Sequence, residues 1–269
     1  MSTPRTGFAF LDDPVQKGGK LAFAHRGGAL HPDVIDLENT LEAFASAVDL
    51  GFRYLETDVQ TTSDGVLVVF HDAVLDRVTD HIGPILALRH ADVSRVRVGG
   101  RALIPTLEQA LEAFPETRFN VDLKSASGVE PMAALVERMQ AHDRVCVGSF
   151  HERILRRFRQ LTGGRVVTSC GVLAVGVLRF APFAAQVERL VRDPGRAFQV
   201  PHRHRGITYV DRRFVEMAHA GGRQVHVWTV DDRAEMEYLL DLGVDGLISD
   251  RTDVLRDVLV ERGEWEGTS

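Results

Sequence analysis

Short apolar stretches alternate with segments of helical periodicity along most of the chain. Eight of the stretches have the composition of buried strands, and they begin at Leu21, Tyr54, Arg118, Arg144, Val166, Ala197, Gln224 and Gly246. Each is followed by a segment whose apolar residues recur at helical spacing. Eight such units in about 250 residues predict an α/β fold, the (β/α)8 TIM barrel. A doubly wound sheet is the alternative, but it usually carries a G-x-G-x-x-G motif after its first strand, and residues 25–28, HRGG, do not match that motif.

The second predicted strand is extended by a further element. Its apolar and polar residues alternate, so that Glu56 and Asp58 share one acidic face. Asp64-Gly65 is a strong turn signal, and residues 66–70 predict a return strand that ends at His71. We therefore expect a β-hairpin insertion after strand 2 that brings His71 back beside the two carboxylates.

Three segments fall outside the repeating units. Residues 1–19 contain Pro and Gly breaks and predict an irregular N-terminal arm or cap. Residues 73–105 predict a long loop with one short helical piece near 85–92, and residues 171–195 predict an apolar, partly helical insertion. The length suits one large domain or two small ones, and the continuous barrel pattern favours a single domain over residues 1–269.

Composition narrows the classes of function. The formal net charge is −6 and the sequence pI is about 6.0, which argues against a nucleic-acid partner because phosphate binding over a large surface needs excess Lys and Arg. Cys146 and Cys170 lie in apolar runs and are expected to be buried free thiols. The N-terminus lacks the apolar core of a signal peptide, and no stretch of about 18 apolar residues is present. We expect a cytoplasmic enzyme without a transmembrane segment.

Polar residues gather where the predicted barrel strands end, which is where TIM barrels carry their active sites. Glu56, Asp58 and Asp122 form a carboxylate cluster that would repel strongly unless protonated or bound to a cation. Ligands that are all oxygen favour Mg²⁺ or Ca²⁺. His25 and His71 are a candidate acid–base pair, because imidazole titrates near neutral pH.

Cationic and aromatic side chains complete this set of candidates. Arg26 and Lys124 suit a phosphate, and salt bridges to the carboxylates are the alternative. Trp228 is either an amphipathic platform at a strand end or core filler. The run at 202–206, HRHRG, predicts a solvated basic loop just past a strand end, and the alternative is that His202 and His204 line the rim of the site. A metal with two imidazoles and two cations is a set suited to phosphodiester cleavage.

These residues resemble the motifs of the glycerophosphodiester phosphodiesterase family. The matching positions, in family order, are His25-Arg26-Gly27, Glu38-Asn39-Thr40, Glu56-x-Asp58, Asp64-Gly65, His71-Asp72, Asp122-x-Lys124, Val227-Trp228-Thr229-Val230 and Gly243-Val244-Asp245-Gly246 with Asp250. The resemblance implies a divalent ion on the three carboxylates, general acid–base roles for the two histidines, and substrate or phosphate contacts from Arg26, Lys124, Trp228, Glu38 and Asn39. It implies hydrolysis of glycerophosphodiesters to glycerol 3-phosphate and an alcohol, with a cyclic phosphate intermediate by similarity to phosphoinositide phospholipases C.

Three positions depart from the family pattern. Leu37 replaces a usual Pro, Asp231 replaces a usual Asn, and Asp122 replaces a usual Glu. The Asp122 carboxylate is one methylene shorter, which bears on metal affinity or choice. Two other activities remain as alternatives: lysophospholipase D or phospholipase C-like cleavage of lysophospholipids, and a catalytically weak phosphodiester-binding barrel. The intact histidine pair argues against the weak binder.

The segment 171–187 is unusually apolar for a loop excursion. One interpretation is a barrel helix with an apolar inner face. The sharper one is a lid or acyl-chain groove that contacts a membrane surface transiently, which would favour lysophospholipid substrates.

Overall fold

Eight parallel strands form a nearly closed barrel in the computed structural model, which describes residues 3–16, 18–180, 185–191 and 195–267. The strand order is β8-β7-β6-β2-β1-β13-β12-β9, and a parallel bridge between Ser169 and Ala197 joins the two outer strands. The barrel strands are β1 (Leu21–His25), β2 (Tyr54–Thr61), β6 (Arg118–Leu123), β7 (Val145–Gly148), β8 (Val167–Thr168), β9 (Ala197–Pro201), β12 (Gln224–Trp228) and β13 (Gly246–Ser249). The predicted TIM barrel is confirmed, and each predicted strand start is correct to within one residue.

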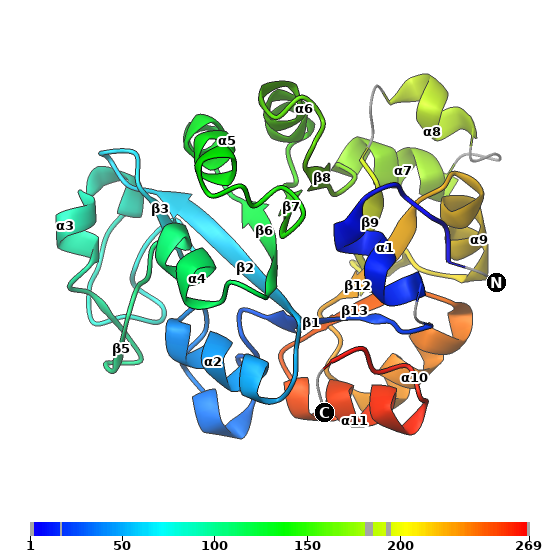
Figure 1. Ribbon diagram of the computed structural model, residues 1–269, viewed down its shortest axis with the longest axis horizontal. Coiled ribbons are helices and arrows are strands. Elements are labelled where there is room, and N and C mark those ends of the chain that lie inside the picture. The colour runs from blue at the N-terminus through cyan, green and yellow to red at the C-terminus, as the bar shows by residue number, and fades with distance from the viewer. Residues whose placement is uncertain (1–2, 17, 181–184, 192–194, 268–269) are drawn as a thin grey trace.

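Helices surround the barrel on its outside (Figure 1). They are α2 (Leu41–Asp49), α4 (Leu107–Ala113), α5 (Val129–Arg138), α6 (Glu152–Leu161), α7 (Val172–Phe180), α8 (Ala185–Leu190), α9 (Arg212–Ala220), α10 (Arg233–Leu242) and α11 (Thr252–Glu261). Four begin at a side chain that accepts a hydrogen bond from the backbone N–H three residues on: Thr40, Thr106, Asp211 and Asp232. These caps satisfy donors that the first helical turn leaves open.

Strand alternation separates two layers of core. Leu55, Val59 and Phe119 point outward and pack beneath the helices. Inward-facing residues fill the lower interior of the barrel, that is, the part toward the amino ends of the strands, among them Leu21, Phe23, Tyr54, Val167 and Ile248. Because successive side chains of a strand point to opposite faces, this alternation carries Glu56 and Asp58 to the interior near the strand ends.

The N-terminal arm is more regular than the sequence predicted. Its residues Ala9–Gln16 form helix α1 (Figure 1), which caps the end of the barrel where the strands begin through Phe10 and Leu11. Pro14 lacks the N–H that would bond the Phe10 carbonyl, and the Tyr54 hydroxyl donates to that oxygen at 2.7 Å instead. Burial against the barrel interior thus stabilises a short helix that local sequence signals disfavour.

The hairpin insertion is present as predicted. Strand β3 (Leu67–Val69) pairs antiparallel with β2, with Val59 opposite Val69 and Thr61 opposite Leu67. The turn contains Gly65 at φ +84°, a conformation in which glycine is favoured. The pairing leads the chain directly back to His71.

The long loop after the hairpin has its own small core. It contains η2 (Ile85–Ala87) and α3 (His90–Val93), close to the predicted helical piece, and a strand pair β4 (Arg97–Val98) and β5 (Ala102–Leu103) that was not predicted. Its buried residues pack on the hairpin strand through Val68 and Phe70. This packing holds the hairpin from the side opposite the barrel. A second small strand pair, β10 (Arg203–His204) and β11 (Ile207–Thr208), follows β9.

Candidate active site

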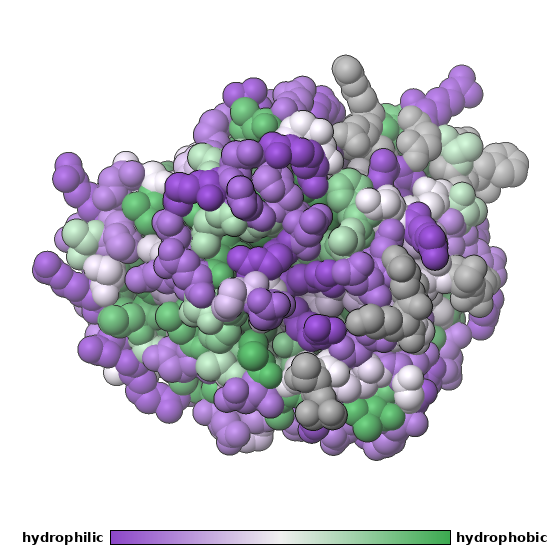
Figure 2. Space-filling view, viewed as in Figure 1, coloured by the Kyte–Doolittle hydropathy of each residue, from purple (hydrophilic) through white to green (hydrophobic). Residues whose placement is uncertain are grey.

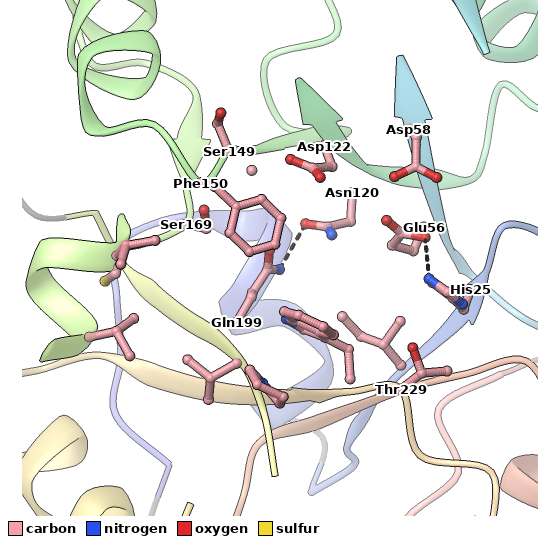
Figure 3. A pocket seen from close by; sticks show the side chains of 18 of the residues that line it. His25, Glu56, Asp58, Asn120, Asp122, Ser149, Phe150, Ser169, Gln199 and Thr229 are labelled. Carbon is pink, nitrogen blue, oxygen red and sulfur yellow. Dashed lines mark hydrogen bonds and ion pairs between the residues drawn. The ribbon is translucent and has the colours of Figure 1, made fainter. Parts of the chain in front are cut away.

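A pocket of about 490 Å³ opens at the carboxyl ends of the barrel strands (Figure 3). Eight of the predicted site residues line it: His25, Arg26, Glu56, Asp58, His71, Asp122, Lys124 and Trp228. Glu38 and Asn39 are not among the lining residues and contact Arg26 and Asp58 from behind. The structure therefore brings the predicted set together in two layers, one on the pocket and one supporting it.

The carboxylates of β2 and β6 are held by two cations. In the parallel register, Asp58 lies opposite Asp122. Lys124 Nζ lies 2.7 Å from Asp58 Oδ1 and 2.6 Å from Asp122 Oδ2, and Arg26 Nε lies 3.2 Å from Asp58 Oδ2. Burial favours the neutral form of Asp58, but the charges of Lys124 and Arg26 outweigh it and hold the pKa of Asp58 below its usual range. The salt-bridge interpretation of both cations is thus correct for this structure.

Glu56 is the least compensated carboxylate of the pocket. The Arg26 backbone N–H donates to Glu56 Oε2 at 3.2 Å, and His25 Nε2 lies 3.7 Å from the same oxygen. Burial, followed by the negative charge of Asp58, raises the pKa of Glu56 to about 8. A buried carboxylate with this pKa either takes up a proton or needs further positive charge beside it.

His25 is fixed by carboxylates on both sides. Its Nδ1 lies 2.8 Å from Asp250 Oδ1 at the end of β13, while Nε2 faces Glu56. Burial disfavours the imidazolium form, but Glu56 and Asp250 outweigh it and raise the pKa of His25. Arg26 follows at φ +50° and Gly27 at φ +85°, so the chain turns sharply after the strand. A Cβ atom on Gly27 would lie 2.7 Å from the Ala43 Cβ, so glycine is required there.

His71 reaches the pocket from the hairpin. Gln60 donates to its carbonyl oxygen at 2.9 Å, and its Nδ1 lies 2.5 Å from Asp72 Oδ1. Arg77 then links Asp72 to Glu38: Nε donates to Asp72 at 2.6 Å, and the two terminal nitrogens donate to both oxygens of Glu38 at 2.8 and 2.7 Å. Because Glu38 also accepts from Arg26 at 3.0 Å, a continuous chain of ion pairs joins the hairpin to the turn after β1.

Sequence reasoning missed part of this arrangement. Asp250 was identified as part of a family motif, but its partner His25 was not predicted. Arg77 lies in an irregular loop without periodicity, so no local pattern marked it. Asn120 and Gln199 also line the pocket, and Gln199 Nε2 donates to Asn120 Oδ1 at 2.8 Å (Figure 3); polar residues at inward positions of two barrel strands were the available signal.

The other half of the pocket is largely apolar. Phe150, Val172, Val175 and Tyr209 line it together with Trp228. Trp228 packs edge-on to Phe150 with ring centroids 6.0 Å apart. Figure 3 shows the Phe150 ring across the pocket from Glu56, Asp58 and His25. The cavity therefore offers a charged wall and a hydrophobic wall to one ligand.

The basic run after β9 is largely exposed, as predicted, over residues 203–206. His202 is buried, and its Nδ1 lies 2.5 Å from Glu235 Oε1. His204 is exposed and lines the pocket from β10. Both cysteines are buried free thiols, as predicted, and no helix in the described ranges is long and apolar enough to cross a bilayer.

The predicted metal ligands all face the pocket but are not gathered around one point. In the part of the chain that the structure describes, no three His, Cys, Asp or Glu side chains converge closely enough to hold a metal ion. The donor chemistry still fits a hard divalent cation, since all three side chains are carboxylates. The pKa of Glu56 is raised first by burial and then by the charge of Asp58, and a cation bound beside it would favour the charged form.

A pocket at the strand ends of a TIM barrel that combines two imidazoles, two cations and three carboxylates is typical of enzymes that cleave phosphodiesters. Residues 25–254 match the glycerophosphoryl diester phosphodiesterase family. The chain belongs to this family.

Individual relatives agree in length and fold. A Mycobacterium tuberculosis protein named probable glycerophosphodiester phosphodiesterase 2 is 43% identical, over 94% of this chain and 96% of its own length. A human protein named lysophospholipase D is 28% identical, over 88% of this chain and 85% of its own length. A phosphodiesterase from Oleispira antarctica, solved in complex with the product sn-glycerol-3-phosphate, superposes with a TM-score of 0.76 at 23% identity, covering 91% of this chain and 98% of the other.

Proposed function

We propose that this enzyme hydrolyses glycerophosphodiesters to glycerol 3-phosphate and an alcohol. The observation that carries the proposal is the placement of two imidazoles on one pocket, each held by its own carboxylate. His25 pairs with Asp250 and His71 pairs with Asp72, so both rings have a fixed orientation. A carboxylate that orients an imidazole and stabilises its charged form is a recurring device of acid–base catalysis.

The two histidines divide the proton transfers. One removes the proton from the attacking glycerol 2-hydroxyl, and the other protonates the leaving alcohol oxygen. The phosphorus–oxygen bond to the alcohol breaks as the bond to the 2-hydroxyl oxygen forms, which leaves a cyclic phosphate. Water then opens the cyclic phosphate with the proton roles reversed. Arg26 and Lys124 bind the phosphate oxygens, and their present ion pairs with Asp58 and Asp122 hold them at the pocket wall.

Glu56, Asp58 and Asp122 are the residues that would hold a divalent cation, Mg²⁺ or Ca²⁺. Support comes from their shared oxygen chemistry and from the undercompensated charge of Glu56. When bound, the cation supplies charge stabilisation at the phosphoryl oxygens and orients the attacking hydroxyl. Glu38 and Asn39 position this wall by holding Arg26 and Asp58.

Metal binding can be tested without turnover. Calorimetric titration with Mg²⁺ and with Ca²⁺ should show binding to the wild type and at least about tenfold weaker binding to Glu56→Gln. Glu108→Gln, which removes a half-exposed carboxylate outside the pocket, is the control. Equal affinities for all three proteins would refute the ligand assignment.

Lysophospholipids are a second candidate substrate class, favoured by the apolar half of the pocket. Phe150, Val172 and Val175 offer a surface for an acyl chain beside the charged wall. A lysophospholipid would place its phosphodiester on the charged wall and its acyl chain on the apolar one. The cytoplasmic location expected from the sequence stays a prediction.

Hydrolysis assays separate these candidates. Glycerophosphocholine, glycerophosphoethanolamine and lysophosphatidylcholine should be incubated with the enzyme, with and without a chelator. His25→Ala and His71→Ala are expected to lower kcat by about 10²–10⁴-fold, the usual share of general acid–base catalysis. His81→Ala is a matched control, because His81 also pairs with a neighbouring aspartate, Asp80, but is 53% exposed and outside the pocket.

Two results would overturn the proposal. Wild-type rates in both histidine variants would refute the acid–base mechanism. Binding of all three substrates without any turnover would favour the catalytically weak binding barrel.

A further inference from the structure

Helix α7 has an apolar face that the fold leaves uncovered. Its inner positions Ala174 and Leu178 are buried in the core. Its outer positions include Leu173, 56% exposed, and Phe180, 73% exposed, with Val177 half-buried between them. Residues 173, 177 and 180 recur at helical spacing, so they form one stripe, which we call the α7 stripe. A helix that is hydrophobic on all sides is normally buried or in contact with lipid.

Helix α7, which carries the stripe, lies at the mouth of the active site. Val172 is 58% exposed on the surface and also lines the pocket, as Val175 does from the next turn. Phe150 adds an exposed ring to the same rim from the end of β7. Exposed apolar side chains of α7 and Phe150 therefore continue into the lining of the pocket. The face seen in Figure 2 is mostly hydrophilic, with smaller hydrophobic areas between the polar ones.

Positive charge lies next to helix α7. Arg179 Nε donates to the Thr208 carbonyl at 2.9 Å, which joins α7 to the β10–β11 hairpin. Arg203 and Arg205 of that hairpin are exposed, as are His204 and Ile207. The first residues of α9, Arg212 and Arg213, are exposed next to it, and Arg213 donates to the Arg179 carbonyl. Asp211, which pairs with Arg179, is the acidic residue of this group.

We propose that the α7 stripe and the β10–β11 hairpin dock this enzyme on the surface of an anionic phospholipid bilayer. Exposed apolar side chains next to arginines match the interface of such a membrane, where the apolar groups enter the headgroup region and the arginines meet anionic lipids. The local positive charge is notable in a chain of net charge −6, which would otherwise be repelled. Docking in this orientation turns the pocket mouth toward the lipid.

This surface shares no residue with the proposed acid–base, phosphate or metal set, so binding can be measured without catalysis. Wild-type protein should be sedimented with vesicles of phosphatidylcholine alone and of phosphatidylcholine with about one-third phosphatidylglycerol. We expect clear binding to the anionic vesicles, weaker binding to the neutral ones, and loss of binding as salt is raised.

Two pairs of variants test the two components. The apolar component is removed by the double variant Leu173→Ser with Phe180→Ser. The charged component is removed by the double variant Arg203→Gln with Arg205→Gln. Each double variant should bind anionic vesicles at least about fivefold more weakly than the wild type. The matched controls lie on the long loop after the β2–β3 hairpin, away from α7 (Figure 1). They are the double variants Leu86→Ser with Ile82→Ser and Arg89→Gln with Arg95→Gln, all at exposed positions. Hydrolysis of glycerophosphocholine should be unchanged in every variant, and thermal unfolding reports the fold if no hydrolysis is found.

Three outcomes would overturn the proposal. Wild-type protein that does not sediment with anionic vesicles has no such surface. If both double variants bind anionic vesicles as well as the wild type, the membrane-binding surface lies elsewhere on the molecule. A wild-type dimer in light scattering that Leu173→Ser with Phe180→Ser converts to a monomer, without vesicle binding in either, would make the stripe an interface between copies of the chain.

Discussion

The stability of the barrel should fall in mild acid because of one buried histidine. His226 is fully buried inside the barrel, at the level between the apolar lower layer and the pocket. Its Nε2 lies 3.1 Å from Gln224 Oε1, and its Nδ1 lies 3.3 Å from Gln199 Nε2. Gln199 Nε2 also donates to Asn120 Oδ1, so the amide must present its N–H to His226. The ring is therefore neutral, with its proton on Nε2 and its lone pair on Nδ1.

The size of the effect follows from the pKa. Burial lowers the pKa of His226 from 6.5 to about 4, with Asp245 opposing it weakly. The unfolded chain takes up the proton at higher pH than the native protein does. The contribution of the neutral His226 ring to the free energy of unfolding is therefore complete above about pH 6.5 and is lost as pH falls toward 4. The full difference corresponds to about 3 kcal/mol, and about 2 kcal/mol of it is lost by pH 5.

Urea unfolding of wild type and His226→Gln at about pH 7.5 and pH 5 isolates this contribution. Other groups titrate in the same range, but they contribute equally to both proteins and cancel in the difference. At neutral pH the variant is expected to be less stable, since it loses ring packing and a hydrogen bond. At pH 5 the stability gap should shrink by about 2 kcal/mol. A gap that does not change with pH would refute the assigned neutral state.

Three further predictions concern single side chains. Arg77→Gln should lower kcat about tenfold with little change in KM, because it releases the Asp72 that orients His71; Arg138→Gln, which breaks a surface pair with Glu108, should leave the kinetics unchanged. Gly27→Ala should cost about 2 kcal/mol or more in urea unfolding, since a contact with Ala43 adds to the backbone strain, whereas Gly164→Ala, at φ +70° with open space, should cost about 1 kcal/mol. Tyr54→Phe should cost about 1–2 kcal/mol, because the buried Phe10 carbonyl next to Pro14 loses its donor; equal stability to wild type would mean that this oxygen finds another donor.

The barrel could be predicted because its strands carry their signal locally. Residues at the inner and outer faces of β1 are both buried, so its sequence is a continuous apolar run. The polar ends of β1, β2 and β6 then marked the mouth, since parallel strands end on the same side. The turn at Asp64-Gly65 set the return of His71, which is a short-range effect of hairpin geometry.

The parts that sequence reasoning missed depend on contacts between distant segments. Helix α1 exists because the lower barrel interior buries Phe10 and Leu11, and its own residues include a helix-breaking Pro14. Arg77 bonds a residue 39 positions away, and no spacing rule reaches that far across a loop. Glu38 and Asn39 were identified by motif alone, which does not distinguish a pocket wall from the layer behind it.

Charge balance links these observations to the chemistry of the site. In the described part of the chain, the ion-pair chain and its neighbours contain the carboxylates of Glu38, Glu56, Asp58, Asp72, Asp122 and Asp250, and the permanent cations Arg26, Arg77 and Lys124. Negative charge is therefore in excess even before an anionic phosphodiester arrives, and the charge of Asp58 adds to burial in raising the pKa of Glu56. Protonation of both histidines would reduce this excess, but it would remove the base that the reaction needs. A divalent ion beside Glu56 would add two positive charges and relieve the excess of negative charge. One imidazole would then stay free to accept a proton. The proposed cation and the proposed acid–base pair therefore support each other.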